Sequence, residues 1–406
     1  MSRREPNVLV VAAALALGST VSLGLARFSY ALLLPAMRAD LGWSYFTAGA
    51  MNTVNAAGYL LGALVVSRVL DRVGPRALFL GGMVTSAVLL LLHGAFSSTG
   101  ALYALRLVSG VTSASTFVSG GLLAARVVVD PGKRAAASGK APGAGLVLGI
   151  YYGGTGVGIV ASALLVPPLI ARPVEHAWQA AWVGLGVLAL LAAVLAAAQT
   201  RAVRAVPQAN GTRTAADLRG LAWGLVSYLL FGLGYIGYMT FVVTLLREQG
   251  LAPAAIVAFY ALLGFAVIAS SWLWAPLLQK YRGGGPMTLL NALLALATVL
   301  PVVSRHPIAV FASGLLFGAV FLSVVASTTA MVRQNLPPTA WAGGIGAFTV
   351  VFAFGQIVGP GGVGWIADAA GGLRAGLACS ALVLLLAAAV ASRQKPLTLP
   401  TSTNAT

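Results

Sequence analysis

The chain has 406 residues, of which 59% are hydrophobic and only 8% charged, whereas soluble globular domains have about 45–50% apolar and about 25% charged residues. This excess of apolar residues excludes a soluble globular protein and predicts one that is embedded in a membrane. The net charge of +17 would suggest nucleic-acid binding in a soluble protein, but here the basic residues stand singly between apolar runs, as they do in membrane proteins, so no nucleic-acid partner is expected.

Apolar runs long enough to cross a bilayer, at about 20 residues each, follow one another along the whole chain. The first begins a few residues after Met1 and is too long for the core of a signal peptide, so we expect it to be a retained span. The sequence predicts twelve helices, at residues 8–36, 44–66, 77–96, 100–128, 140–168, 178–199, 220–246, 253–278, 286–304, 308–333, 340–367 and 373–392.

The distribution of basic residues predicts the topology. Twelve spans place both termini on one side, and the segments on that side hold eighteen of the 25 Lys and Arg residues. The other side holds five, and the remaining two, Arg27 and Arg106, fall within spans. The positive-inside rule therefore predicts cytoplasmic termini. The richness in Ala, Gly and Arg is typical of a high-GC bacterium, hence of a cell inner membrane.

A polar stretch and an internal repeat divide the chain into two halves. Residues 24–30 of the first helix resemble residues 232–238 of the seventh, and such repeats place a substrate site at their interface near the membrane midplane. The predicted fold is an all-α membrane protein of two six-helix pseudo-symmetric bundles. Its parts are a bundle at 1–199, a linker at 200–219, a bundle at 220–392 and a tail at 393–406.

The segment after the second helix resembles the loop signature of the major facilitator superfamily. Asp71, Arg72, Gly74 and Arg76 match that signature, and Arg106 followed by Gly110 and the run 359–368 resemble the motifs of its helices four and eleven. The segments 27–37 and 41–44 are similar to the uncharacterised bacterial YbfB/YjiJ-type branch. The resemblance covers essentially the whole chain and implies a secondary transporter with the major facilitator fold.

Arg27 and Arg106 are the candidates for chemistry inside the membrane. A charged side chain at mid-bilayer is costly and should face the bundle interior or a water-filled cavity. No Asp or Glu falls in the interior of a predicted span, so a substrate could supply the missing negative charge. We hypothesise a small organic anion bound mainly by Arg27, whose planar fork suits a carboxylate. The alternative is that Arg27 bonds helix carbonyls; for Arg106 a structural or coupling role is favoured.

Aromatic and amide side chains are predicted to flank the same site. Residues three apart share a helix face, which pairs Arg27 with Tyr30, Asn52 with Asn55, and Tyr235 with Tyr238. Ordinary helix packing is the alternative for each of them. The full set of substrate-binding candidates is Arg27, Tyr30, Asn52, Asn55, Tyr151, Tyr152, Tyr235, Tyr238, Trp272 and Gln356.

Charged residues at helix ends are candidates for gating and coupling. We expect Asp71 with Arg72 and Arg76 to form a cytoplasmic ion-pair latch that favours the outward-facing state. Arg106 is a second coupling candidate, and Asp368 could titrate at the end of helix eleven. Import or export, and symport, antiport or uniport, stay open, as does a co-transported proton.

Other functions are less well supported by the sequence. The lone Cys379 and the eight scattered acidic residues offer no metal site and no cluster for acid-base work, so neither a metal, a cofactor nor an enzymatic activity is expected. No Walker-type loop is present, which excludes an ATP-driven pump. Sugar or drug efflux and a membrane-embedded sensor remain alternatives. The expected partners are the small-molecule substrate and membrane lipid, and one chain supplies both halves, so a monomer is expected.

Overall fold

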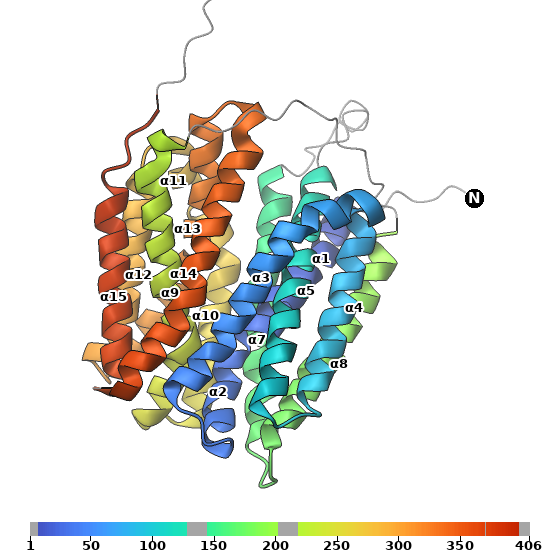
Figure 1. Cartoon of the computed structure of the whole chain (residues 1–406), viewed down its shortest axis with the longest axis vertical. Helices are drawn as coiled ribbons and strands as arrows, with labels where there is room; N and C mark the ends of the chain where they lie inside the picture. The colour runs from blue at the N-terminus through green and yellow to red at the C-terminus, as the bar shows by residue number, and fades with distance from the viewer. Residues whose placement is uncertain (1–6, 128–143, 202–217, 370, 398–406) are drawn as a thin grey trace, which may run out of the picture.

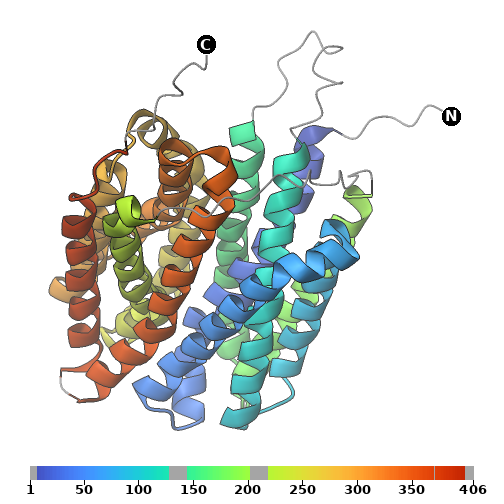
Figure 2. The same ribbon diagram turned by 45° about the horizontal axis from the view of Figure 1, so that its top comes forward.

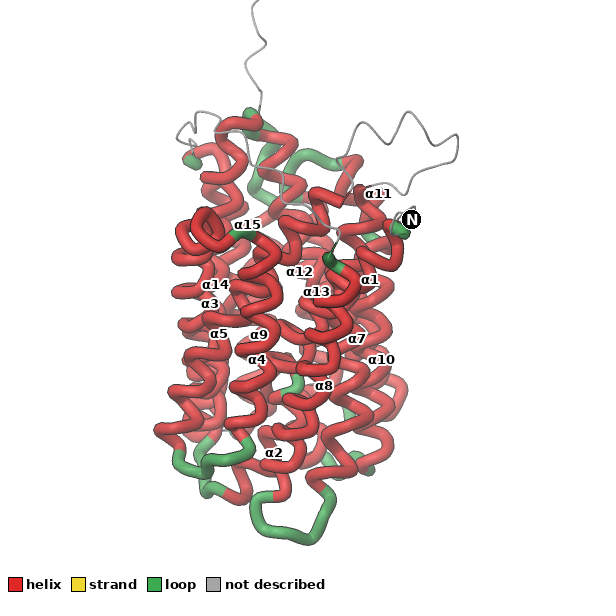
Figure 3. Tube along the Cα trace, turned by 90° about the vertical axis from the view of Figure 1, so that its right-hand side faces the viewer, coloured by secondary structure: helices red, strands yellow, loops and turns green. Residues whose placement is uncertain are grey.

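The computed structural model describes residues 7–127, 144–201, 218–369 and 371–397. In these ranges every regular element is a helix and none is a strand, with loops and turns between the helices (Figure 3). Twelve segments of this part of the chain are long and apolar enough to cross a membrane. The predicted all-α fold with twelve spans is therefore confirmed.

Six spans come before residue 201, and the first of them is built from three consecutive segments. The elements of this half are α1 (Val8–Ser19), η1 (Thr20–Phe28), α2 (Tyr30–Asp40), α3 (Tyr45–Val73), α4 (Pro75–His93), α5 (Thr99–Val127), α7 (Ala144–Ile170) and α8 (Ala177–Gln199). In Figure 1 they occupy the right-hand bundle, coloured blue to green.

The other six spans follow residue 218 and form the left-hand bundle of Figure 1. One of them is broken at Trp274, because Pro276 has no N–H with which to continue the helix. The elements of this half are η2 (Arg219–Leu221), α9 (Ala222–Glu248), α10 (Pro253–Leu273), α11 (Ala275–Lys280), α12 (Gly285–Val303), α13 (Pro307–Asn335), η3 (Pro338–Ala340), α14 (Trp341–Ala369) and α15 (Gly372–Ala391).

A nine-residue π-helix, η1, interrupts the first span, where the sequence predicts a continuous α-helix. π-helices are rare, occur frequently at functional sites, and disturb the regular backbone hydrogen-bond pattern of the helix. Three carbonyl oxygens of η1 accept hydrogen bonds from side chains of other helices. The donors are Ser113 to Ser22 (2.9 Å), Arg106 to Ala26 (2.7 Å) and Tyr260 to Phe28 (2.6 Å).

The most extensive contacts between the halves are those of two helix pairs: α3 packs on α14, and α7 packs on α10. Glycines let the backbones approach closely in both pairs. A Cβ atom at Gly49 would lie 2.3 Å from the carbonyl oxygen of Pro360, and one at Gly156 would lie 2.4 Å from that of Gly264. No larger residue fits without moving a helix, so these glycines set the spacing of the two halves.

The α3–α14 pair is closed at one end of the molecule. We call the end where α1 begins and α15 ends, at the top of Figure 1, the termini face, and the other end the opposite face. Near the opposite face the backbone N–H groups of Tyr45 and Phe46 donate to the carboxylate of Asp368 (2.9 and 2.8 Å), and Thr53 donates to the carbonyl of Ile357 (2.7 Å). From there α3 and α14 diverge toward the termini face (Figure 2).

Candidate functional site

Two arginines are buried in the interior, as the sequence predicts. Arg27 is 2% exposed and Arg106 is 1% exposed. No carboxylate of the described residues forms an ion pair with either guanidinium. Because a buried charge needs acceptors, the hydrogen bonds of each arginine show whether it has N–H donors left for a ligand.

Arg106 on α5 is surrounded by acceptors from its own half. Its Nη1 donates to the carbonyl of Ala26 (2.7 Å), its Nη2 to Asn52 Oδ1 (2.6 Å) and its Nε to the carbonyl of Met51 (3.5 Å). The guanidinium also lies over the ring of Tyr30, 5.0 Å from its centroid. All three nitrogens are therefore used, and one of them holds the π-helix that carries Arg27.

Arg27 is far less well satisfied. Its Nη2 donates to Gln356 Oε1 on α14 (2.7 Å), but its buried Nε has no hydrogen-bond partner. Nη1 likewise finds no acceptor among the described residues. The guanidinium lies 5.6 Å from the centroid of the Tyr59 ring. A guanidinium has five N–H donors, so Arg27 keeps donors that a ligand could use.

Aromatic rings from the second half lie next to Arg27. Gln356 Nε2 donates to the hydroxyl of Tyr235 on α9 (2.5 Å), which links the arginine to these rings. Tyr228, Phe231 and Tyr235 follow one face of α9 and stack on Phe352 of α14, with ring planes within 16° of parallel. We call the rings of Tyr228, Phe231, Tyr235 and Phe352 the ring wall. The ring wall forms one cluster with Arg27 and Gln356, which we call the Arg27 cluster.

Two predicted amides lie around Arg106 and not around Arg27. Asn52 accepts from Arg106 and donates to the hydroxyl of Thr240 on α9 (2.9 Å), so it connects the two halves. Asn55 donates to the backbone carbonyl of Arg106 (3.0 Å). These amides therefore hold the Arg106 network, and Asn52 extends it to the second half.

Tyr30, predicted beside Arg27, contacts Arg106 instead. Its hydroxyl donates to the carbonyl of Ala48 (2.8 Å), and its ring lies beneath the Arg106 guanidinium. The predicted pairing assumed α-helical geometry, whereas Arg27 belongs to the π-helix and Tyr30 begins the next α-helix. The three-residue spacing therefore does not bring these two side chains to one partner.

Four further candidates do not bond to Arg27. Tyr151 is buried and donates to the carbonyl of Phe117 (2.6 Å), while Tyr152 is half-buried beside it. Tyr238 bonds to the hydroxyl of Ser313 and stacks on Phe317, 4.0 Å between ring centroids. Trp272 is 45% exposed and lies against Gly149, where α10 meets α7.

The predicted latch of Asp71, Arg72 and Arg76 is not formed in this arrangement. Arg76 donates to the carbonyls of Thr200 and Ala197 at the end of α8 (both 3.1 Å). Neither Asp71 nor Arg72 forms an ion pair with another residue in the described ranges. In this conformation Arg76 therefore ties α4 to the end of α8, and Asp71 forms no ion pair with another described residue.

Asp368, at the end of α14, caps a helix of the other half. Both carboxylate oxygens accept from the first two N–H groups of α3, where a negative charge is favoured by the helix dipole. Beside it the hydroxyl of Tyr45 donates to Glu248 at the end of α9. These contacts place two of the eight acidic residues on the closed end of the interface between the halves.

The sequence analysis missed several residues of the cluster. Tyr59 follows Asn55 by four positions, and Phe352 precedes Gln356 by four, so helical spacing places each on the face of a residue that was chosen. Phe231 precedes Tyr235 by four positions and Tyr228 precedes it by seven, which again places all three on one helix face. Extending each chosen face by one or two turns would have found them.

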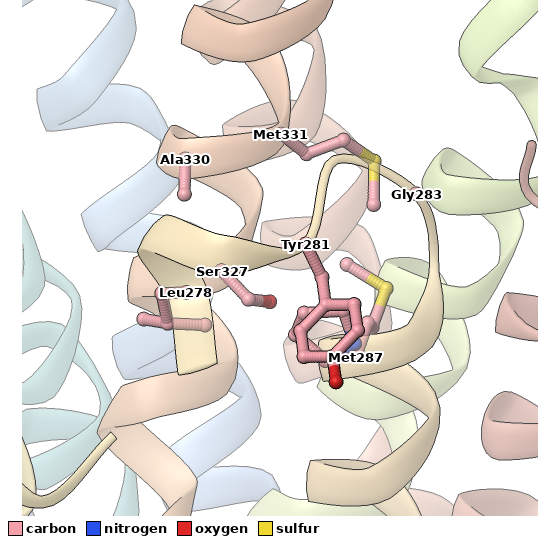
Figure 4. A pocket seen from close by; sticks show the side chains of 8 residues that line it. Leu278, Tyr281, Gly283, Met287, Ser327, Ala330 and Met331 are labelled. Atoms are coloured by element: carbon pink, nitrogen blue, oxygen red, sulfur yellow. The ribbon is translucent and has the colours of Figure 1, made fainter. Parts of the chain in front are cut away.

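Two further features of the described ranges lie apart from the Arg27 cluster or bear on a metal. No group of three or more His, Cys, Asp or Glu residues that could hold a metal occurs there. Figure 4 shows a small recess near the termini face, lined by Leu278, Tyr281, Met287 and Met331 among others, without a charged side chain. It contains none of the predicted site residues.

His176, in the connection before α8, is expected to make stability depend on pH. Its Nδ1 lies 2.5 Å from Asp40 Oδ2, and this carboxylate raises the pKa of His176 above its ordinary value of about 6.5. The contact with Asp40 therefore stabilises the folded state fully at pH values below the pKa that His176 has in the unfolded chain. This stabilisation is lost as the pH rises through the raised pKa that His176 has in the folded protein. We expect His176→Asn, which tolerates the left-handed φ of 52°, to remove this part of the fall in melting temperature with rising pH. Identical pH profiles for the two proteins would contradict this.

Solved structures share the fold. The nucleoside transporter NupG superposes with a TM-score of 0.68 at 14% identity, over 94% of this chain and 96% of that chain. A bacterial homologue of the human lysosomal transporter Spinster, in an inward-facing and unoccupied conformation, gives a TM-score of 0.72 at 15% identity, over 97% of this chain and 98% of that one. At these identities the comparisons establish the fold alone.

The family is shown by the sequence itself. No curated protein matches the chain. The family model described as "Uncharacterised MFS-type transporter YbfB" matches residues 19–392, nearly the whole chain. The chain therefore belongs to this family of major facilitator transporters.

Proposed function

We propose that the chain is a secondary transporter that moves a small organic anion across a bacterial inner membrane by alternating access. Residues 1–199 and 220–392 would be the two moving halves, with a linker at 200–219 and a tail at 393–406. The observation that carries the proposal is the buried guanidinium of Arg27, which has one amide acceptor and unused donors. A carboxylate can accept two parallel hydrogen bonds from such a fork.

The charge distribution disfavours the other substrate classes. A site for cationic drugs would be expected to hold an acidic side chain, yet no Asp or Glu of the described residues bonds to a member of the Arg27 cluster. A site for neutral sugars would not need a cation with unused donors, and burying one costs several kcal/mol in general. An anionic substrate is the class that would accept hydrogen bonds from the Arg27 guanidinium and neutralise its charge.

The conformation fits an inward-facing state. We place the termini face in the cytoplasm, because most basic residues of the connections belong to that side. The opposite face, closed by α3 and α14, is then the outer one. In the outward-facing state α3 and α14 would approach each other at the termini face, and the latch of Asp71, Arg72 and Arg76 is proposed to form there.

Asp368→Asn is expected to weaken the outer closure. The amide loses the charge that the two N–H groups of α3 bind, which is worth about 1 kcal/mol, or roughly a fivefold shift toward the outward-facing state. The measurement is the labelling rate of a cysteine at Gly361, on α14 beside Thr53, in a Cys379→Ala background. An impermeant maleimide should label Gly361→Cys faster when Asp368 is replaced.

Glu175→Gln is the matched control for the Asp368 experiment. Glu175 is an exposed acid of the same face, with a side chain 86% exposed, so its loss should leave the labelling rate unchanged. An equal rate in the Asp368→Asn and control proteins would show that the carboxylate does not hold this closure.

Coupling and partners complete the proposal. Because no carboxylate of the described residues bonds to Arg27, a co-transported proton would travel on the substrate acid or bind at Asp368. We expect a monomer in contact with membrane lipid, with no cofactor, metal or nucleic acid. The coupling role suggested for Arg106 would be exerted through its bonds to the π-helix and to Asn52.

A thermal-shift screen of the purified protein in detergent tests the proposed class. A ligand that binds the folded state raises the melting temperature with concentration. We expect small carboxylates to stabilise the protein and sugars and organic cations to have no effect. Stabilisation by sugars or cations alone would refute the organic-anion assignment, and the transporter family would stand.

A further inference from the structure

We infer that the preferred substrate is a monocarboxylate that carries an aromatic ring. This inference rests on the proposed function, because it assigns a class of organic anion to the Arg27 site. Two features of the site support it: the number of positive charges available to the ligand, and the flat surfaces beside them.

The site offers one guanidinium, which suits one carboxylate. Arg106 is the other buried arginine, but its three nitrogens are already bonded to Ala26, Asn52 and Met51. Within the described part of the chain, no second basic side chain bonds to Gln356 or Tyr235, the groups that hold Arg27. A dicarboxylate would leave its second charge without a partner, which is costly away from water.

Aromatic rings approach Arg27 from both halves. Tyr59 of α3 lies 5.6 Å from the guanidinium, and Tyr235 of α9 is joined to it through Gln356. A carboxylate on Arg27 would therefore have its substituent between rings of the two halves.

Part of this aromatic surface is not covered by the protein. Tyr59 and Phe352 are half-buried, and no described residue forms a hydrogen bond with the Tyr59 hydroxyl. The rings of the ring wall are nearly parallel, for example Tyr228 on Phe352 at 4.7 Å. A flat aromatic ligand can stack on such surfaces, whereas an aliphatic one gains only area burial.

Three probes of similar size separate charge from ring. Benzoate has both features, cyclohexanecarboxylate has the charge without the aromatic ring, and benzamide has the ring without the charge. Binding is measured by isothermal titration calorimetry of the full chain in detergent. We expect benzoate to bind roughly three- to tenfold more tightly than cyclohexanecarboxylate, and at least tenfold more tightly than benzamide.

Variants of Tyr59 test whether the ring beside Arg27 causes the preference. Tyr59→Leu should reduce the ratio of benzoate to cyclohexanecarboxylate affinity roughly threefold, and Tyr59→Phe should keep it. Tyr281→Leu is the matched control, because Tyr281 is 48% exposed and lies near the termini face. Its ratio should equal that of the unmodified protein.

The outcomes distinguish the two levels of the proposal. Equal affinity for the two carboxylates overturns the aromatic assignment while the organic-anion function stands. Binding of benzamide as tight as that of benzoate, or no binding of any carboxylate, overturns both. If Tyr59→Leu keeps the full preference for benzoate, neither Tyr59 nor this site is the source of the preference, and the aromatic assignment is overturned.

Discussion

Arg27→Gln is expected to abolish the response to carboxylates while the melting temperature of the ligand-free protein stays the same or rises slightly. The reason is the poor pairing of this side chain, which is buried with one amide partner and an unpartnered Nε. Replacing a poorly compensated buried charge with a neutral side chain removes the cost of keeping that charge away from water, so we expect a neutral or stabilising effect. Sites that bind ligands commonly carry such a cost in stability.

The measurement is thermal unfolding in detergent with and without benzoate. Arg27→Lys should respond weakly, because an ammonium keeps the charge but lacks the planar fork. Arg305→Gln is the control, since Arg305 is an exposed arginine in the connection before α13. A large fall in the melting temperature of ligand-free Arg27→Gln would show instead that Arg27 is a structural residue.

Arg106→Gln is expected to have the opposite effect and to destabilise the protein by about 3 kcal/mol or more, since each hydrogen bond to a charged group contributes about 1.5–3 kcal/mol. Glutamine is too short to reach Ala26, Met51 and Asn52 together. The carbonyl of Ala26 would then lose its donor, and the π-helix that positions Arg27 would lose one of its three side-chain supports.

Thermal unfolding gives the test of Arg106, with the same exposed Arg305→Gln as reference. The melting temperature should fall by several degrees. Because the π-helix carries Arg27, carboxylate affinity should also fall, although Arg106 itself is not proposed to contact the ligand. A protein of unchanged stability that loses all carboxylate binding would instead place Arg106 in direct contact with the substrate.

Much of the architecture could be predicted because it depends on local composition. The length of each apolar run determines whether it can span the bilayer, and all twelve predicted spans are observed. The scarcity of charge in those runs likewise singles out Arg27 and Arg106. Gln356 and Tyr235, both chosen from the sequence as cavity candidates, lie next to Arg27.

The different surroundings of the two arginines could not be predicted. Arg106 is saturated by a carbonyl 80 residues away in the π-helix and by an amide 54 residues away, and only the packing of α5 against the first span and α3 brings these acceptors to it. The π-helix has no simple sequence signal, and it separates Tyr30 from Arg27. Asp368 caps a helix 323 residues earlier in the chain, a contact created only when the two halves dock.

The proposed function requires that one organic anion binds at Arg27. The most direct test is calorimetric titration of benzoate into the unmodified protein and into Arg27→Gln at one pH, with both proteins shown to be folded. We expect saturable binding of one benzoate per chain to the unmodified protein and an affinity at least tenfold weaker in the variant. Equal affinity in the two proteins would contradict it, because the anion would then bind elsewhere.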